Sequence, residues 1–235
     1  MDWLINKTNM RLPKCSVVVV ECVVDAAACL LCFAMLNAAI QEYCVRDDDT
    51  TAESVRLLRW PAARDAVGLA VSRDQRSIWL LGGWQWNGAT AQVDQFDTTN
   101  HTWTYEISKM RVRRAGASVL TLENGDIYAC GCEVTTSFQG SMCIKTCDVW
   151  SATTEQWRLM AFAGGCRGRA VAVVNGDQLY FTGGDCGQQT AVIVYDTTQG
   201  NWKRATNMPQ QRTAHMAASF TNRLVLCGGL SRDRR

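Results

Sequence analysis

Three tryptophans of this chain are each followed ten residues later by an arginine, and this spacing constrains the fold more than any other feature. The pairs are Trp103 and Arg113, Trp157 and Arg167, and Trp202 and Arg212. An aromatic residue stands seven positions before each tryptophan, at Phe96, Trp150 and Tyr195. A unit that recurs at intervals of 45 to 54 residues is typical of propellers and solenoids, in which each repeat packs on its neighbours.

Each unit also contains a short apolar run that ends in glycine. These runs close at Gly82-Gly83, Gly131, Gly183-Gly184 and Gly228-Gly229, and Arg64 opens the first of them. Glycine is expected there because it lets backbone pass where a Cβ atom would clash. The repeat therefore extends from Arg64 to Gly229.

Two of the units contain a β-hairpin signal. Residues 118–122 and 126–130 flank an Asn-Gly pair at 124–125, and residues 172–174 and 178–181 flank another at 175–176. Asn-Gly favours tight hairpin turns because it tolerates positive φ at both central positions. Asp97 and Asp196 are suited to start the turn that leads to the tryptophan strand. Each unit is therefore predicted to form four antiparallel strands, as in a propeller blade.

The pattern resembles the kelch repeat. The copy that matches best runs from Val194-Tyr195-Asp196 through Trp202, Met208-Pro209 and Arg212 to Gly228-Gly229. The resemblance implies a mainly β fold, a kelch-type β-propeller over residues 61–230, with units at 61–108, 112–160 and 165–208 and a partial unit at 209–230. It also implies that the repeated aromatic, arginine and glycine residues are structural and stabilise the packing of neighbouring blades.

About three and a half units are fewer than most kelch propellers contain, and propellers usually have four to eight blades. Three explanations remain open at this point. The chain is a truncated product, or it is an open array that closes by self-association, or its last blade is completed by a strand from residues 16–24, which are rich in β-branched residues.

Residues 1–60 contain no glycine, and residues 26–40 are made of good helix formers, so a helical segment is expected here. The uncharged run of 16 residues at 26–41 is short for a membrane span. Residues 43–48 and 54–61 resemble the end of a BACK domain. This resemblance implies a shortened member of the BTB-BACK-kelch group, whose members in animals and large DNA viruses act as substrate adaptors for cullin ubiquitin ligases. Viral origin and a role in host–virus interaction are therefore included in the expectation.

Composition excludes several classes of function. A net charge of +2 does not predict the basic surface patch that nucleic-acid-binding proteins have. The charged tail at 231–235 is expected to be solvated. The 12 cysteines are scattered, so they are predicted to be reduced in a cytoplasmic protein. Cys29 and Cys32 lack a matching second pair for zinc, and His101 and His215 lie in different units. No catalytic, metal or cofactor site is predicted.

The remaining candidates lie in the links between the second and third strands of each unit, which vary freely in a propeller and gather on one face. Two tryptophans in one link are suited either to anchor a protein partner or to fold back over the blade. Two arginines next to repeat arginines are suited to an acidic partner segment. The partner-binding candidates are Trp84, Trp86, Asn87, Arg114, Phe138, Gln139, Arg169, Gln188 and Gln189.

The sequence thus predicts a non-catalytic protein-binding module of the ubiquitin-ligase adaptor type. Cullin binding is in doubt without a BTB domain, although the chain would still be able to compete with full-length adaptors. The alternative is a degenerate kelch fragment that is structural or self-associating and has no specific target. Neither hypothesis includes nucleic acid or membrane as a partner.

Overall fold

The computed structural model describes residues 17–21, 39–45, 52–59, 64–131, 133–136, 140–165, 167–168, 170–184, 189–221 and 223–230. The chain divides into two compact units, residues 1–65 and 66–235. All regular elements assigned in the described ranges are β-strands. Within the same ranges, no helix has the length and apolar character that crossing a bilayer requires.

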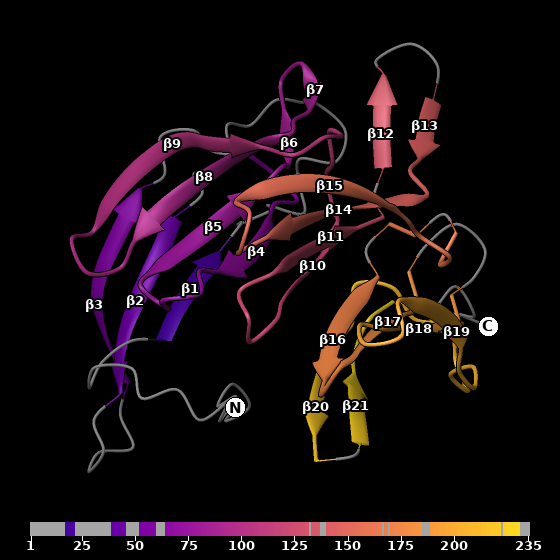
Figure 1. Ribbon diagram of the computed structural model, residues 1–235. Helices are drawn as coiled ribbons and strands as arrows, with labels where there is room; N and C mark the ends of the chain where they lie inside the picture. Colours follow the sequence, from indigo (N-terminus) through magenta and orange to yellow (C-terminus); the bar gives the residue numbers. More distant parts are fainter. Residues whose placement is uncertain are drawn as a thin grey trace. The chain divides into compact units, whose positions relative to one another are not determined.

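The second unit contains three four-stranded antiparallel sheets, here called the first, second and third blades (Figure 1). The first blade consists of β4 (Gly68–Val71), β5 (Ser77–Leu81), β8 (Gln92–Asp97) and β9 (Thr102–Lys109). The second consists of β10 (Ser118–Thr121), β11 (Ile127–Cys130), β14 (Thr146–Ser151) and β15 (Gln156–Ala161). The third consists of β16 (Val171–Asn175), β17 (Gln178–Thr182), β18 (Val192–Asp196) and β19 (Asn201–Arg204). The predicted blade architecture is confirmed.

Three smaller hairpins complete the second unit. The hairpin of β20 (Met216–Phe220) and β21 (Arg223–Cys227) corresponds to the partial fourth unit. Two further hairpins lie in the links between second and third strands, β6 (Trp84–Gln85) with β7 (Gly88–Ala89), and β12 (Glu133–Thr136) with β13 (Gly140–Cys143).

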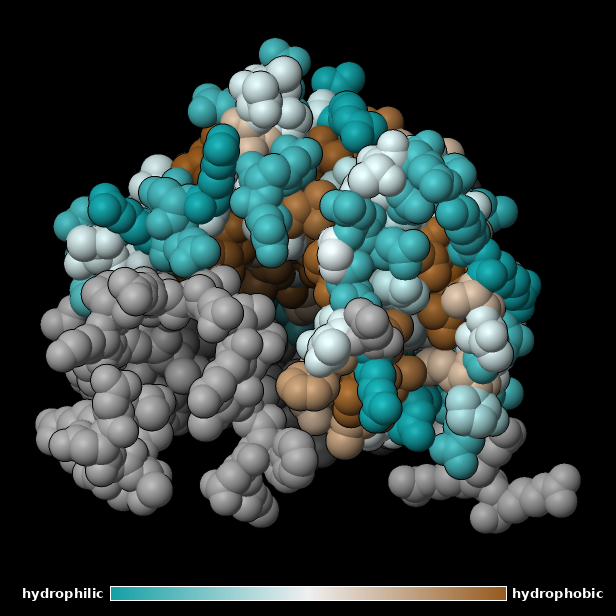
Figure 2. All heavy atoms as spheres, turned by 60° about the horizontal axis from the view of Figure 1, so that its bottom comes forward, coloured by the Kyte–Doolittle hydropathy of each residue, from teal (hydrophilic) through white to brown (hydrophobic). Residues whose placement is uncertain are grey.

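The blades pack through their first strands and their flat faces. Strand β10 lies beside β4, β16 beside β10, and β20 beside β16. One core cluster joins the first and second blades through Leu81, Val93, Ile127, Ala129 and Trp157. Another joins the second and third blades through Leu120, Tyr128, Phe162, Leu179 and Phe181. The middle strands are therefore covered on both faces, as their continuous apolar sequences predict. Hydrophobic residues are visible mainly in recessed parts of the surface (Figure 2).

The repeated tryptophans connect consecutive blades. Trp157 Nε1 donates to Ser108 Oγ at 2.8 Å, and Trp202 Nε1 donates to the Ala161 carbonyl at 3.1 Å, each in the preceding blade. Each tryptophan also packs on the aromatic residue seven positions earlier, with ring centroids 5.0 Å apart for Phe96 and Trp103, 5.4 Å for Trp150 and Trp157, and 4.8 Å for Tyr195 and Trp202. Trp157 and Trp202 thus contact both their own blade and the preceding one.

The turns between the aromatic and the tryptophan are closed by aspartate. Asp97 accepts hydrogen bonds from the backbone N–H of Thr99 at 2.7 Å and of Asn100 at 2.9 Å. These bonds favour the charged carboxylate and hold the pKa of Asp97 below its usual value. Asp196 accepts from the backbone N–H of Thr198 and Gln199 in the same way. The predicted turn-starting role is confirmed at both positions.

The repeated arginines bind backbone carbonyls at the ends of the blades; Arg167 is buried and Arg212 is half-buried. Arg167 Nη1 donates to the carbonyls of Gly183 at 2.9 Å and Ala191 at 2.8 Å. Burial, with a smaller contribution from Arg204, lowers the pKa of Arg167 to about 10. Arg212 Nη1 donates to the Gly228 carbonyl at 2.5 Å. Each arginine thus ties the start of one unit to the glycine that ends its first hairpin.

In the second blade, this role belongs to Arg114 and not to Arg113, so the sequence prediction was wrong there. Arg114 Nη1 donates to the carbonyls of Gly131 and Thr146, and its Nε lies 2.8 Å from Asp148 Oδ2. Both side chains of the ion pair are 0% exposed, whereas Arg113 is exposed. A β-bulge between Val93 and Gln95 lengthens the stretch after Trp103, and the buried arginine follows eleven positions later instead of ten.

The glycine that ends each apolar run lies against the arginine of the next unit. A Cβ atom on Gly82 would lie 2.2 Å from the Arg114 carbonyl oxygen, and one on Gly183 would lie 2.2 Å from the Arg212 carbonyl oxygen. Both glycines also have positive φ, at 64° and 60°. Glycine is required here because the chain both turns left-handed and passes next to another backbone segment.

His215 lies buried where the partial unit meets the third blade. Its Nε2 lies 2.8 Å from Thr182 Oγ1, and the Thr182 hydroxyl is also within 3.2 Å of the Val171 carbonyl. Burial, followed by the positive charge of Arg212, lowers the pKa of His215. The imidazole is therefore held in its neutral form at this junction.

The first unit contains strands where a helical segment was predicted. Strands β1 (Val17–Glu21), β2 (Ala39–Val45) and β3 (Ala52–Arg59) form an antiparallel sheet in the order β1-β2-β3. The β-branched run of β1 explains its conformation, and strand pairing overrides the helix propensity of Ala39. The rest of the expected helix, 26–38, lies outside the described residues. The segments that resemble the end of a BACK domain contribute to β2 and β3.

The strand predicted within 16–24 exists as β1, but it pairs with β2 instead of completing the partial unit. The pair of β2 and β3 resembles the last two strands of a blade in register, although Tyr43 and Ser54 are 11 residues apart and the aromatic and tryptophan of the other units are seven apart. Tyr43 lies opposite Ser54 in the register, as Tyr195 lies opposite Trp202. Arg64 follows Ser54 by ten residues. The sequence pattern missed this copy because serine stands at the tryptophan position.

Cys130 and Cys147 form a disulfide, which corrects the prediction that the cysteines are reduced. The two residues lie opposite each other on β11 and β14, and both are buried. The corresponding cross-strand pairs are Leu81 with Val93 in the first blade and Thr182 with Val192 in the third. Sequence spacing did not identify the pair because the two cysteines meet through strand register, 17 residues apart.

Candidate functional site

Each blade has two chemically different ends. One, here called the link end, carries the links between second and third strands (82–91, 131–145, 183–191) and the segments that follow the fourth strands (110–117, 162–170, 205–215). The other, here called the turn end, carries the tight turns at 72–76, 97–101, 122–126, 151–155, 175–177 and 196–200. Because successive strands are antiparallel, these two sets lie at opposite ends of the blades.

The link of the first blade presents an exposed tryptophan on a tethered hairpin. Trp86 follows β6 and is 86% exposed, with exposed Asn87 beside it, whereas Trp84 is half-buried on β6. The hairpin stands out from its blade, and β7 lies beside β12 of the next link (Figure 1). The three link candidates of the first blade therefore lie together.

Backbone hydrogen bonds hold the base of this hairpin. Gly83 N–H donates to the Arg114 carbonyl at 2.7 Å, and Arg114 N–H donates to the Thr90 carbonyl at 3.0 Å. Thr90 N–H in turn donates to the Gly83 carbonyl at 3.0 Å. Since the Arg114 side chain is itself locked by Asp148, the buried ion pair supports the base of the hairpin that carries Trp86.

Two of the remaining candidates are not available to a partner. Arg114 is fully buried in its ion pair, and Gln189 is buried with its carbonyl accepting from Arg212 N–H at 3.1 Å. Both stand at positions where the chain turns back into the blade, which the sequence does not distinguish from an exposed link. Four candidates lie outside the described residues or have no described side chain: Phe138, Gln139, Arg169 and Gln188.

The sequence prediction missed two exposed arginines next to the hairpin base. Arg111 and Arg113 flank Val112 in the segment that follows β9, and both are exposed. Arg111 is positioned through its backbone N–H, which donates to Asp148 Oδ1 at 2.6 Å. The signal for them was present as the run Arg111 to Arg114, but choosing the exposed members requires knowing which arginine is buried.

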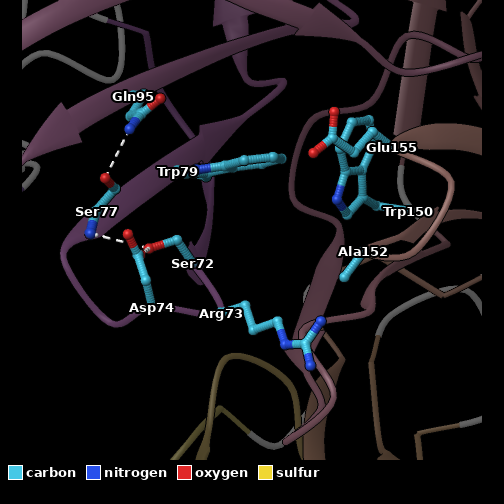
Figure 3. Close-up of a pocket in the computed structure, with 9 residues that line it drawn as sticks. All are labelled: Ser72, Arg73, Asp74, Ser77, Trp79, Gln95, Trp150, Ala152 and Glu155. Carbon is cyan, nitrogen blue, oxygen red and sulfur yellow. Dashed lines mark hydrogen bonds between the residues drawn. The ribbon is translucent and has the colours of Figure 1, made fainter.

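The turn end contains a pocket between the first and second blades (Figure 3). Its volume is about 610 Å³, and Trp79 and Trp150 meet edge to face in it with centroids 5.3 Å apart. Ser72 Oγ donates to Asp74 Oδ1 at 2.5 Å, and Gln95 Nε2 donates to Ser77 Oγ at 2.6 Å. The bond from Ser72 and the Arg76 N–H lower the pKa of Asp74. These four polar side chains hydrogen-bond with one another or with nearby backbone, whereas the buried Nε1 of Trp79 has no hydrogen-bond partner among the described residues.

Within the described part of the chain, no group of three or more His, Cys, Asp or Glu residues is arranged to hold a metal ion. His101 and His215 lie in separate parts of the second unit, at a turn-end loop and at the junction with the partial unit.

Comparison with known proteins supports the repeat assignment. A family profile for the kelch motif matches residues 166–209, which include the third blade. The chain is 25% identical over 183 residues to the kelch repeat-containing protein kel-10 of Caenorhabditis elegans, covering 70% of this chain and 30% of that protein. The chain thus spans less than a third of the length of this relative.

The fold is similar to that of a solved structure titled "Structure of YjhT". The similarity has a TM-score of 0.68 at 16% sequence identity and covers 81% of this chain and 66% of that one. At this identity the likeness concerns the fold alone. Residues 166–209 thus match the kelch motif, and the chain is similar to a kelch-repeat protein and to a solved structure of the same fold.

Proposed function

We propose that the chain is a non-catalytic protein-binding module that holds its partner at the link end. The observation that carries this proposal is Trp86, a large apolar side chain that is 86% exposed at the tip of a hairpin whose base is fixed by backbone hydrogen bonds. Tryptophan is enriched among the residues that dominate binding energy at protein interfaces. Kelch repeats generally mediate protein interactions, which agrees with this placement.

A rigid scaffold with an exposed anchor reduces the ordering cost of binding. The blade that carries the hairpin packs against the second blade, and backbone hydrogen bonds hold the hairpin base, so little backbone freedom remains to be lost there when a partner docks. Trp86 and Asn87 lie on the same hairpin, and the second-blade link lies beside it. A partner that covers Trp86 is therefore expected to contact both links.

We expect Trp86→Ala to weaken capture of the partner by about 2 kcal/mol or more, close to a thirtyfold loss of affinity, because it removes the exposed anchor. The measurement is quantitative affinity capture from a lysate by the immobilised chain, followed by titration of the proteins retained. Phe220→Ala is the matched control, since Phe220 is also exposed, at 72%, but lies at the far end of β20.

Equal loss with both variants, or none with either, would contradict the proposal. Mass that rises with concentration in light scattering, without a captured partner, would instead favour the self-associating alternative. Strand β21 gives that alternative a structural basis. Among the described strands it pairs with β20 alone, and its Val225 is 54% exposed.

The biological setting that we propose is the ubiquitin-ligase adaptor group, with the link end holding the target protein. This part of the proposal is supported by the kelch repeats and by the sequence resemblance of residues 43–61. Ubiquitin-ligase subunits among the proteins captured by the chain are its expected signature. If the captured proteins include no ubiquitin-ligase subunit, the adaptor assignment would be contradicted, but the proposal of a protein-binding module would stand.

A further inference from the structure

The two ends of the blades carry opposite charge, although the whole chain has a net charge of only +2. Among the described residues, the link-end segments contain six basic residues, Arg111, Arg113, Arg114, Lys145, Arg167 and Arg212, and one acidic residue, Glu133. The turn-end segments contain seven acidic residues, Asp74, Asp97, Glu123, Asp126, Glu155, Asp177 and Asp196, and two basic ones, Arg73 and Arg76. Such segregation produces a field that selects the charge of an approaching partner.

Part of the positive charge at the link end is free to meet a partner. Arg114 and Arg167 are buried and bound to carbonyls, but Arg111, Arg113 and Lys145 are exposed. Among the described residues, no carboxylate forms an ion pair with any of these three; the described side-chain ion pairs are Lys109 with Glu106, Arg114 with Asp148, and Lys203 with Asp196.

These cations are tied to the same backbone as the Trp86 hairpin. Arg111 and Arg113 lie just before Arg114 in the chain. The backbone of Arg114 hydrogen-bonds to Gly83 and Thr90 at the base of the hairpin. Lys145 precedes Thr146, whose carbonyl accepts from Arg114 Nη1 at 2.7 Å. Arg114 therefore fixes the backbone on either side of it, next to both the basic residues and the hairpin.

Several acidic residues of the turn end accept hydrogen bonds from backbone N–H groups of the turns. Asp97 and Asp196 close the turns before the tryptophan strand, and Asp126 accepts from Ala152 N–H at 2.9 Å. The charge segregation therefore has a structural origin at one end, where carboxylates hold the turns. At the link end, the guanidinium groups of the exposed Arg111 and Arg113 form no hydrogen bond or ion pair with the described residues.

We infer that the link end recognises an acidic protein segment that also carries an apolar residue. Carboxylates of the segment bind the Arg111 and Arg113 guanidinium groups, which favour planar, paired recognition of carboxylate, and the apolar residue packs on Trp86. This inference rests on the proposed function and specifies the chemistry of the partner. The acidic turn end repels the same acidic segment, and this repulsion orients the segment on the chain.

The test is selection of a phage-displayed library of random peptides on the immobilised full chain at low salt. We expect the retained peptides to be enriched in Asp and Glu together with an apolar residue. Arg111→Ser with Arg113→Ser should weaken binding of the selected peptides by about tenfold or more and flatten its salt dependence, because exposed interface charges act on steering and specificity. Arg73→Ser with Arg76→Ser is the matched control at the turn end and should leave binding unchanged.

The outcomes separate this inference from the proposed function. Neutral or basic peptides whose binding still requires Trp86 would overturn the acidic partner while keeping the binding module. Acidic peptides that lose equal affinity with either arginine pair would overturn the assignment to the link end. No selected peptide, together with no partner captured from lysate, would overturn both proposals. Thermal melts of both double variants should match that of the unmodified chain, because all four arginines are exposed.

Discussion

Arg114→Ala should cost about 3 to 5 kcal/mol of the free energy of unfolding, because it leaves a buried carboxylate without its partner. Arg114 and Asp148 are both 0% exposed and lie 2.8 Å apart. The same change also removes the hydrogen bonds to the carbonyls of Gly131 and Thr146. Chemical denaturation of purified protein measures the loss.

Arg113→Ala is the matched control, one residue away on the same segment. Arg113 is exposed, and surface substitutions of this kind usually change stability by less than about 0.5 kcal/mol. The sequence repeat would assign the structural role to Arg113, so the two variants discriminate between the repeat spacing and the structure. A large loss with Arg113→Ala and a small one with Arg114→Ala would contradict the packing described here.

Phe181→Ala is expected to cost about 3 to 5 kcal/mol, the range for truncating a large aromatic residue in a core. Phe181 is 0% exposed on β17, and its ring centroid lies 5.1 Å from that of Phe162 and 5.7 Å from that of Trp202. Because Phe162 follows the second blade and Trp202 belongs to the third, the cavity would open at the contact between blades. Thermal and denaturant unfolding should both show the loss.

Phe220→Ala provides the control for this substitution, since the side chain of Phe220 is 72% exposed. A change of about 0.5 kcal/mol or less is expected there. If Phe181→Ala were tolerated equally well, the second and third blades would not share the core that the structure places between them. A broader unfolding transition for Phe181→Ala would also indicate weaker contact between the repeats, because such weakening reduces the cooperativity of unfolding.

Much of the fold could be predicted from the sequence because its signals are local and repeated. The Asn-Gly turns, the apolar runs ending in glycine and the spacing of Trp157 and Trp202 from their arginines all report short-range geometry. Each signal predicts one blade, and four-stranded antiparallel sheets are present. Asp97 and Asp196 were identified in the same way, since each bonds residues only two or three positions ahead.

The errors arose where strand register or burial decides the outcome. The bulge in the first blade displaces the buried arginine by one position, so Arg113 and Arg114 exchange roles. In the first unit, Ser54 stands where the repeat has tryptophan, and the blade-like register of β2 and β3 was hidden. Cys130 and Cys147 are distant in sequence and meet only because β11 pairs with β14.

For the candidate site, the sequence predicted the link that carries Trp86 but not the charged residues near its base. Trp84, Trp86 and Asn87 lie on one hairpin as expected, whereas Arg114 and Gln189 are buried. Exposure of Arg111 and Arg113 follows from the fold of the segment after β9, which depends on contacts with residues some 20 to 40 positions away. The sequence alone therefore did not show that the segment containing Arg111 and Arg113 holds the base of the Trp86 hairpin.

The most direct test of the account is hydrogen exchange on the full chain with and without a partner captured through Trp86. The account predicts slower exchange at 82–91 and 110–114 when the partner is bound, and unchanged exchange at 72–76 and 151–155. Protection confined to the turn-end segments, or spread equally over both ends, would contradict the claim that the link end is the binding surface.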